Sequence, residues 1–352
     1  MNILLLGGTG AIGKDVATAL DNGQNEVYVT SRSTHADVGQ VHYLQGNARD
    51  LDFLKQALKT AQWDTVVDFM VYHSQDDFTR HMNLMLENTH QYVFLSSCRV
   101  FAASNAPITE NSPRHLEANN DDEFLNSYEY AVAKAKQEDA LRKSKYGNWT
   151  IIRPYITFND NRLQLGVMEK ENWLYRALHG RTIVFSDDIA SKLTTLTSGH
   201  DVSACIAKVI GQPSSLGKTY NVTAPEQHTW SEILNIYLET LEKHLGKQPK
   251  VMMTKEYKSF YGMPFQVKYD RLYDRTFDNS KISQATKGFV FSDVRASLTE
   301  CLERFMYHPR FLQIDWAEQA YLDKLTKERA SLKEIPGWRS KLVYIHLRYF
   351  SK

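Results

Sequence analysis

The sequence predicts an α/β protein with a doubly wound parallel sheet and a smaller second domain, on three observations. A short apolar run at residues 2–6 is followed at once by four glycines within seven positions, from Gly7 to Gly13. Strand-like and helix-like stretches then alternate through the first ~155 residues, the pattern of βαβ units. The chain of 352 residues is long enough for one large or two modest domains.

The expected strands of the first part are short apolar runs, as buried parallel strands usually are. They lie at residues 2–6, 26–30, 41–44, 65–71, 92–95 and 149–152. Helical patterns are expected at residues 14–20 and 51–61. Beyond Pro154 the alternation loosens, and residues 181–185, 218–222 and the helical 230–245 suggest a smaller second domain.

Composition narrows the class of protein. Hydrophobic content is 42%, charged content 24% and the formal net charge +1, so no global field favours nucleic acid. The first residues resemble a strand rather than a signal peptide, and no 18-residue apolar run predicts a membrane span.

Three widely spaced cysteines form neither a disulfide framework nor a metal motif, so we expect a cytoplasmic protein. The twelve histidines lack metal-site spacing, and no metal is expected.

The glycines fit two dinucleotide-binding templates. Gly8, Gly10 and Gly13 match GxGxxG, and Gly7, Gly10 and Gly13 match GxxGxxG. Both stand between a predicted strand and a predicted helix, where such a motif binds a pyrophosphate. A tight turn and a close pyrophosphate leave no room for Cβ atoms, and the last glycine lets the helix pack on the sheet. A flexible glycine turn is the other interpretation.

The residue type after the second strand predicts which dinucleotide binds. An acidic residue there would bind the ribose 2′-hydroxyl of NAD, but this chain has Ser31 and Arg32. Arginine suits a 2′-phosphate by charge and by geometry, so we predict NADP, with NAD as the alternative. A solvated surface arginine is the competing interpretation.

A second constellation lies in SYEYAVAKAKQEDAL. Tyr130 and Lys134 are four residues apart on a helical stretch and therefore share a face. A nearby ammonium lowers a tyrosine pKa from about 10, which suits proton transfer to a carbonyl. A solvent-facing pair is the alternative. Upstream, YVFLSSCRVF reads as a strand ending in hydroxyls, at the sheet edge where doubly wound folds bind ligands.

With these motifs the chain resembles the extended short-chain dehydrogenase/reductases, also called NAD-dependent epimerase/dehydratases. The segments GGTGAIG, SSCRVF, YAVAK, IIRPYITF, LTSGHDVSACI, TYNVTAPEQHTWSEI and FDNSKISQATKGF follow in family order. The resemblance implies a Rossmann-like dinucleotide-binding domain at 1–158, which the chain re-enters near 194–222 and 274–282. It further implies a substrate domain over 159–310, followed by a helical, aromatic tail at 311–352.

The resemblance also assigns site residues. Ser97, four residues before Phe101, Tyr130 and Lys134 would be catalytic, with Ser97 rather than Ser96 in the serine role. The implied cofactor contacts are Gly7, Gly10, Ala11, Ile12, Gly13, Arg32, Asn47, Ala48, Met70, Val71, Tyr130, Lys134, Pro154 and Ile156. Two positions depart from the family: Asn47 replaces an acid, and Ile156 replaces the asparagine of many nucleotide-sugar epimerases.

The two residues after the serine bear on the reaction. Where sugar 4,6-dehydratases carry an acidic pair, this chain has Cys98 and Arg99, which argues against dehydration. Both are candidates for substrate contact. For Cys98 the other role is packing in the core. The guanidinium of Arg99 suits a phosphate or carboxylate of the substrate. The other role for Arg99 is a salt bridge at the domain seam.

The resemblance therefore implies an NAD(P)-dependent oxidoreductase that acts on a nucleotide-activated sugar, as a ketosugar reductase or a 4-epimerase. The less typical fourth-strand phrase VVDFMVYHSQDDF places it near bacterial polysaccharide-locus reductases and chloroplast stem-loop RNA-binding proteins. A non-catalytic, RNA-binding or cofactor-sensing relative is thus the alternative. We expect a small-molecule partner, no nucleic acid, and a homodimer as one option. The basic, aromatic tail would either pack on its own body or lie on an anionic membrane.

Overall fold

The computed structural model describes residues 1–258 and 263–351, which form two compact units. Unit 1 comprises Met1–Thr157, Thr195–Glu226 and Thr276–Ser292. Unit 2 comprises Phe158–Thr194, Gln227–Arg275 and Asp293–Lys352, so the tail belongs to the same unit as the second-domain segments. Among the described residues, no helix has the length and apolar character needed to cross a bilayer.

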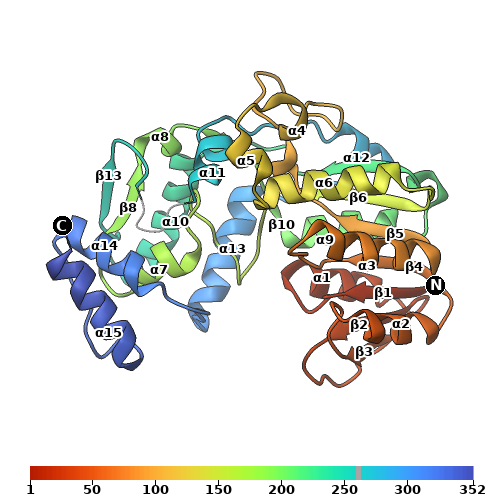
Figure 1. Ribbon diagram of the computed structural model, residues 1–352. Helices are drawn as coiled ribbons and strands as arrows, with labels where there is room; N and C mark the ends of the chain where they lie inside the picture. The colour runs from red at the N-terminus through yellow and green to blue at the C-terminus, as the bar shows by residue number, and fades with distance from the viewer. Residues whose placement is uncertain (259–262, 352) are drawn as a thin grey trace. The chain divides into compact units, whose positions relative to one another are not determined.

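Unit 1 is built on a seven-stranded sheet whose order is β11-β6-β5-β4-β1-β2-β3 (Figure 1). Its strands are β1 (Asn2–Leu6), β2 (Glu26–Ser31), β3 (Val41–Gln45), β4 (Trp63–Asp68), β5 (Thr89–Leu95), β6 (Trp149–Pro154) and β11 (Lys218–Val222). Every neighbouring pair is parallel. The predicted doubly wound α/β fold is therefore confirmed, with the strand order reversing between β1 and β4, where such folds bind ligands.

Two expected elements need correction. The strand predicted at residues 65–71 ends at Asp68, because the Asp68 carboxylate turns back to accept the N–H of Met70 at 2.8 Å. The strand pattern alone groups 218–222 with the second domain, whereas the family resemblance places it in the part of the chain that re-enters the dinucleotide-binding domain. The stretch is the edge strand β11 of unit 1, paired along its length with β6. The sequence of an isolated strand carries no information about which sheet it joins.

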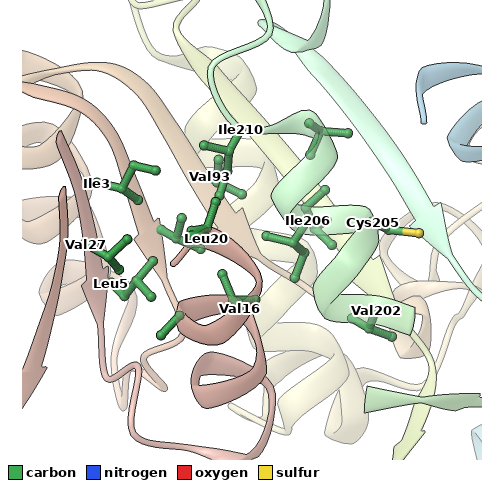
Figure 2. Packing of buried hydrophobic residues seen from close by; sticks show 14 of the residues in the cluster. Ile3, Leu5, Val16, Leu20, Val27, Val93, Val202, Cys205, Ile206 and Ile210 are labelled. Atoms are coloured by element: carbon green, nitrogen blue, oxygen red, sulfur yellow. The ribbon is translucent and has the colours of Figure 1, made fainter. Parts of the chain in front are cut away.

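Helices cover both faces of the sheet in unit 1. They are α1 (Ala11–Leu20), α2 (Leu51–Lys59), α3 (Gln75–Glu87), η1 (Cys98–Val100), α4 (His115–Ala118), α5 (Asp122–Asn126), α6 (Tyr130–Lys143), α9 (Gly199–Val209), η2 (Pro213–Ser215) and α12 (Ser280–Ala285). Side chains alternate along β1: Ile3 and Leu5 join the core that α1 and α9 cover (Figure 2). Leu4 and Leu6 join the opposite core with Phe78 of α3. Burial on both faces explains why β1 is apolar throughout.

Unit 2 is mostly helical. Its helices are α7 (Lys170–Leu178), α8 (Asp187–Ala190), α10 (Trp230–Leu245), α11 (Pro264–Gln266), η3 (Val267–Arg271), α13 (Val294–Tyr307), α14 (Trp316–Thr326), α15 (Gly337–Ile345) and η4 (His346–Phe350). Its short strands pair as β8 (Ile183–Ser186) with β13 (Val251–Thr254) and as β9 (Leu193–Thr194) with β12 (His228–Thr229). A further short pair, β7 (Ile156–Phe158) with β10 (Leu196–Ser198), lies almost entirely within the residues of unit 1.

A buried ion-pair network joins the tail to the rest of unit 2. Arg176 of α7 and Arg181 both contact the buried carboxylate of Asp323 in α14, at 2.6 and 3.1 Å. Tyr344 of α15 donates to the same carboxylate at 2.7 Å. Removing one partner of such a network leaves a buried charge uncompensated, at a cost of about 3–5 kcal/mol. The tail is therefore an integral part of this unit.

Candidate active site

The glycine-rich loop joins β1 to α1, and its glycines serve different purposes. Gly7 has a φ of 69°, and a Cβ there would lie 2.8 Å from the Sδ of Met70. A Cβ on Gly13 would lie 2.5 Å from the Cα of Gly8, so this glycine allows α1 to pack against the loop. A Cβ on Gly10 would meet only the Gly7 carbonyl oxygen, at 3.7 Å. Gly10 therefore borders open space, while the other two are required by the protein's own packing.

The N-terminus of α1 is suited to an anion. Gly10 is its N-cap residue, and no side chain caps this helix end. The first N–H groups of α1 thus lack the usual side-chain acceptor, and the helix dipole favours negative charge there. Ile12 packs into the core, and its carbonyl accepts a 3.1 Å bond from Ser203, so only its N–H remains for a cofactor. The side chain of Ala11 lies outside the described part of the structure.

A cavity of about 350 Å³ opens beside this loop. It is lined by residues that follow β1, β2, β3 and β4, so it lies at the carboxyl edge of the sheet next to the switch point. The lining residues are Gly7, Thr9, Gly10, Thr30, Ser31, Arg32, Gly46, Asn47, Ala48, Arg49 and Met70. The structure thus brings together most of the residues predicted to hold the adenosine half of a dinucleotide.

Two arginines line this nucleotide cavity. Arg32, predicted from the sequence, follows β2, and Arg49 follows β3. Among the described residues, neither guanidinium makes an ion pair with a carboxylate, and that of Arg49 donates to the Val71 carbonyl at 2.9 Å. Sequence reasoning missed Arg49, because the resemblance assigned cofactor contacts to Asn47 and Ala48 and gave no role to the residue that follows them. Open space at Gly10, an uncapped helix end and two cations without carboxylate partners fit a phosphorylated dinucleotide.

A second, smaller cavity of about 130 Å³ contains the predicted acid/base pair. Its lining residues are Val71, Tyr72, His73, Tyr128, Tyr130, Ala133, Lys134 and Gln137. Met70 lines the first cavity and Val71 the second, so consecutive residues after β4 border both. A dinucleotide that occupied both cavities would therefore contact the loop after β4.

Helix α6 presents the predicted pair, as its spacing requires. Tyr130 is the first residue of α6 and is 37% exposed, while Lys134, one turn later, is only 4% exposed. The Lys134 Nζ lies 6.0 Å from the centre of the Tyr130 ring. Glu129 caps the helix by accepting the N–H of Ala131 at 2.6 Å. The phenol is therefore accessible to a substrate while its neighbouring ammonium is shielded from water.

The environment of Lys134 tunes its charge. Its Nζ donates to the Leu95 carbonyl at 2.8 Å and lies 4.4 Å from the centre of the Phe94 ring. Burial lowers the pKa of Lys134 to about 8, against the opposing attraction of the Asp68 and Glu138 carboxylates. An ammonium with this pKa is partly deprotonated just above neutral pH, which is a common property of catalytic groups.

Asp68 is a component of this site that sequence reasoning did not assign. It ends β4 and is completely buried, and its carboxylate accepts bonds from Tyr72 at 2.8 Å and Tyr92 at 2.6 Å. Burial raises the pKa of Asp68, while hydrogen bonds and Lys134 act in the opposite direction. The signal was present: an acid within the otherwise apolar phrase VVDFMV requires a partner.

The two serines after β5 have different partners. The Ser96 hydroxyl donates to the buried carboxylate of Glu138 at 2.6 Å. Ser97 is the N-cap of η1, and its oxygen accepts the N–H of Arg99 at 3.2 Å, which leaves its O–H free to donate elsewhere. This geometry supports Ser97 over Ser96 in the catalytic role.

Cys98 and Arg99 were both candidates for substrate contact. Cys98 is completely buried, and its thiol contacts the Arg153 carbonyl at 3.1 Å. Burial of the thiol therefore favours the packing role for Cys98 over contact with a substrate. Arg99 pairs with Glu129 and lies 5.4 Å from the centre of the Tyr130 ring. Both partners of this ion pair belong to unit 1, and the pair places a guanidinium beside the phenol.

Pro154 and Ile156 lie further from the described cavities. Pro154 ends β6, Ile156 begins β7, and both are buried and line neither cavity. Their proposed contact with a nicotinamide stays a prediction. Within the described ranges, no group of three or more His, Cys, Asp or Glu side chains is arranged to hold a metal ion.

Comparison with known proteins identifies the family. The sequence model of an NAD(P)H-binding family matches residues 7–198, more than half of the chain. Among curated proteins, the chloroplast stem-loop binding protein of 41 kDa b from Arabidopsis thaliana is 21% identical over 245 residues. That match covers 65% of this chain and 60% of the relative, so the chain spans less than two thirds of the length of that relative.

Solved structures show the same fold. A dTDP-glucose 4,6-dehydratase from Bacillus anthracis, in complex with NAD, is 16% identical, covers 88% of this chain and 97% of that chain, and has a TM-score of 0.66. A UDP-glucuronic acid 4-epimerase from Bacillus cereus, in complex with NAD, is 15% identical, covers 86% and 99%, and has a TM-score of 0.64. The chain belongs to the NAD(P)H-binding family and has the fold of the extended short-chain dehydrogenase/reductases.

Proposed function

We propose that this protein is an NADP(H)-dependent oxidoreductase that acts on a nucleotide-activated sugar, as a ketosugar reductase or a 4-epimerase. One observation carries the proposal: the accessible Tyr130 and the buried Lys134 line a cavity that shares the loop after β4 with the nucleotide cavity. The relatives in complex with NAD include sugar-nucleotide enzymes, which supports the substrate class. A cytoplasmic location and a role in polysaccharide synthesis are parts of the same proposal.

The chain's own residues account for the proton transfer. When bound, the nicotinamide would supply the hydride for the carbonyl carbon of the substrate. The Tyr130 hydroxyl gives its proton to the carbonyl oxygen, which becomes the alcohol. The Lys134 ammonium stabilises the resulting phenolate, and the Leu95 carbonyl holds that ammonium in place. The Ser97 hydroxyl donates a hydrogen bond that orients the substrate oxygen.

The two arginines of the nucleotide cavity support NADP over NAD. A 2′-phosphate offers each guanidinium charge-assisted hydrogen bonds, each worth about 1.5–3 kcal/mol. The 2′-hydroxyl of NAD would leave both cations without a charged partner. A preference for NADPH in turn favours the reductase among the two reactions, since NADPH is the usual cellular reductant.

The test is to measure the cofactor in the purified protein and then NADPH consumption with a panel of nucleotide-linked ketosugars. We expect an exchangeable site that takes NADPH and an alcohol product detectable by NMR. Firmly bound NAD together with 4-epimerisation of a nucleotide sugar would support the epimerase instead. Absence of both reactions, with normal cofactor binding, would contradict the proposal.

A second candidate follows from the curated relative, which is described as a stem-loop binding protein. Under this hypothesis the chain binds RNA and the dinucleotide serves as a sensor signal. The formal net charge of +1 offers little general attraction for a polyanion. Salt-dependent retention of a stem-loop RNA that is unchanged in Tyr130→Phe, with no oxidoreductase activity, would favour this candidate.

A further inference from the structure

We propose that the exposed face of the last helical segment docks on the surface of a bilayer that contains anionic lipid. This outer face is formed by five large apolar side chains of α15 and η4, namely Trp338, Leu342, Val343, Tyr349 and Phe350, each between 45% and 74% exposed. The inference does not depend on the proposed redox activity.

The segment is anchored by its opposite face. Tyr344 is only 1% exposed, and its hydroxyl donates to Asp323 and accepts the N–H of Ala330 at 2.7 Å. Ile345 and Leu347 pack against the same apolar cluster, and α15 lies beside α14 at the edge of unit 2 (Figure 1). The segment is thus apolar on both faces, and within residues 1–258 and 263–351 only one of these faces packs against the rest of the protein. A cluster of exposed apolar side chains on this scale is typical of interaction surfaces.

The charge of the segment indicates the kind of partner. Residues 335–352 contain four Lys or Arg residues and no Asp or Glu. Two of the cations lie against exposed rings: the Arg339 guanidinium is 5.4 Å from the centre of the Trp338 ring, and that of Arg348 is 5.0 Å from the centre of the Tyr349 ring. Aromatic rings at the acyl boundary with cations at the headgroups are the pattern of interfacial helices on anionic membranes.

A hollow beside the outer face provides a place for a headgroup. This cavity of about 600 Å³ is lined by Gln313, Ile314, Asp315, Trp316, Ala317, Arg339, Ser340 and Val343. The indole Nε1 of Trp316 is buried and has no hydrogen-bond acceptor among the described residues. The Asp315 carboxylate also lies there, but it accepts the N–H groups of Ala317 and Glu318. Arg339 and Ser340 are the lining donors that a lipid phosphate can use.

The experiment is flotation of the full-length protein with vesicles of phosphatidylcholine alone and with added phosphatidylglycerol, at physiological ionic strength. We expect flotation only with the anionic vesicles, and its loss at high salt. The double variant Trp338→Ser/Leu342→Ser should lower binding at least about tenfold. It removes two apolar side chains that are exposed in the free protein and would be buried in the bilayer. Arg339→Glu/Lys341→Glu should lower it at least about 25-fold, because each lost cation is worth about fivefold and each new carboxylate is repelled by the anionic surface.

Matched variants control for apolar and charged surface elsewhere. Val290→Ser removes an 84% exposed apolar side chain of unit 1, and Lys247→Glu/Lys250→Glu makes the same charge change at exposed positions outside the segment. Both should bind vesicles like the wild type, and all variants should keep the wild-type circular dichroism spectrum.

Three results would overturn the proposal. They are equal flotation with neutral and anionic vesicles, equal binding by the outer-face variants and their controls, and displacement of the vesicles by inorganic phosphate alone. A change of oligomeric state in Trp338→Ser/Leu342→Ser, measured by light scattering without any vesicle binding by the wild type, would instead assign the face to a second copy of the chain.

Discussion

The two cavities at the carboxyl edge of the sheet handle charge in opposite ways. The nucleotide cavity carries two exposed arginines with no carboxylate partner in the described residues, so its charge is available to a ligand. The cavity of α6 carries a buried lysine whose charge is disfavoured by burial and only partly compensated by the carboxylates of Asp68 and Glu138. The first arrangement suits binding, and the second suits control of a proton. Affinity and chemistry should therefore respond to different mutations.

The largest expected effect is on the chemical step alone. Tyr130→Phe removes the proton donor and should lower kcat by about 10²–10⁴-fold. The dissociation constant for NADPH, measured by fluorescence titration, should stay within about twofold, because the phenol lies outside the nucleotide cavity. Tyr146→Phe, which removes a surface hydroxyl that contacts Glu87, is the matched control and should behave like the wild type. Parallel loss of cofactor affinity in Tyr130→Phe would break the division between the two cavities.

The second prediction uses the pKa of Lys134. Because burial lowers that pKa to about 8, the reductive kcat should fall as pH rises through about 8, where the ammonium is lost. Lys134→Met should abolish this limb of the pH profile and lower kcat on the order of 10²-fold. A pH profile with the same limb in Lys134→Met would assign the titration to another group.

The same shift makes a prediction about stability. Between about pH 8 and the ordinary lysine pKa of 10.5, the unfolded chain binds more protons at this residue than the folded chain. This group therefore makes the free energy of unfolding rise with pH across that window. Below about pH 8 the cost of burying the charge is fully present. Urea denaturation at several pH values should show this rise in the wild type and a smaller one in Lys134→Met.

The nucleotide cavity should show the converse behaviour. Arg32→Ala and Arg49→Ala should each weaken NADPH binding by about 10–100-fold and leave NADH binding nearly unchanged, because each removes a phosphate contact. Isothermal titration with both cofactors measures this, and Arg310→Ala, an exposed arginine of unit 2, is the control. Equal losses for NADPH and NADH would show that the arginines do not read the 2′-phosphate.

The smallest expected effects separate the neighbouring serines. Ser97→Ala should lower kcat by about tenfold. It should lower the free energy of unfolding by only about 0.5–1 kcal/mol, because it removes the acceptor for the Arg99 N–H. Ser96→Ala should leave kcat nearly unchanged but lower the free energy of unfolding by about 1–3 kcal/mol, because Glu138 loses a buried donor. Steady-state kinetics and urea denaturation of the two variants measure kcat and the free energy of unfolding, and so show which serine acts in catalysis. The reverse assignment of effects would move the catalytic hydroxyl to Ser96.

Local sequence patterns predicted the sheet of unit 1 and the acid/base pair. The apolar run before Gly7 and the spacing of Tyr130 and Lys134 depend only on residues close together in the chain. The missing components depend on spatial relations that no local pattern records. Asp68 of β4 acts electrostatically on Lys134 of α6, and Arg49, in the loop after β3, lines the nucleotide cavity. The local pattern also fails to place 218–222 in the sheet, since β11 pairs with β6 across more than sixty residues. The resemblance to the family is what assigned this stretch to the dinucleotide-binding domain.

The edge strand β11 has a consequence for how the nucleotide-binding unit is made. Its partner strand β6 and the apolar face covered by α9 are synthesised before β11 and α9 themselves, with the first segment of unit 2 in between. A nascent or truncated chain ending near residue 157 would expose both an unpaired strand edge and part of the core, a combination that promotes aggregation. Unit 1 therefore cannot be excised as one continuous fragment. Its fold can be completed only after its later segments have left the ribosome.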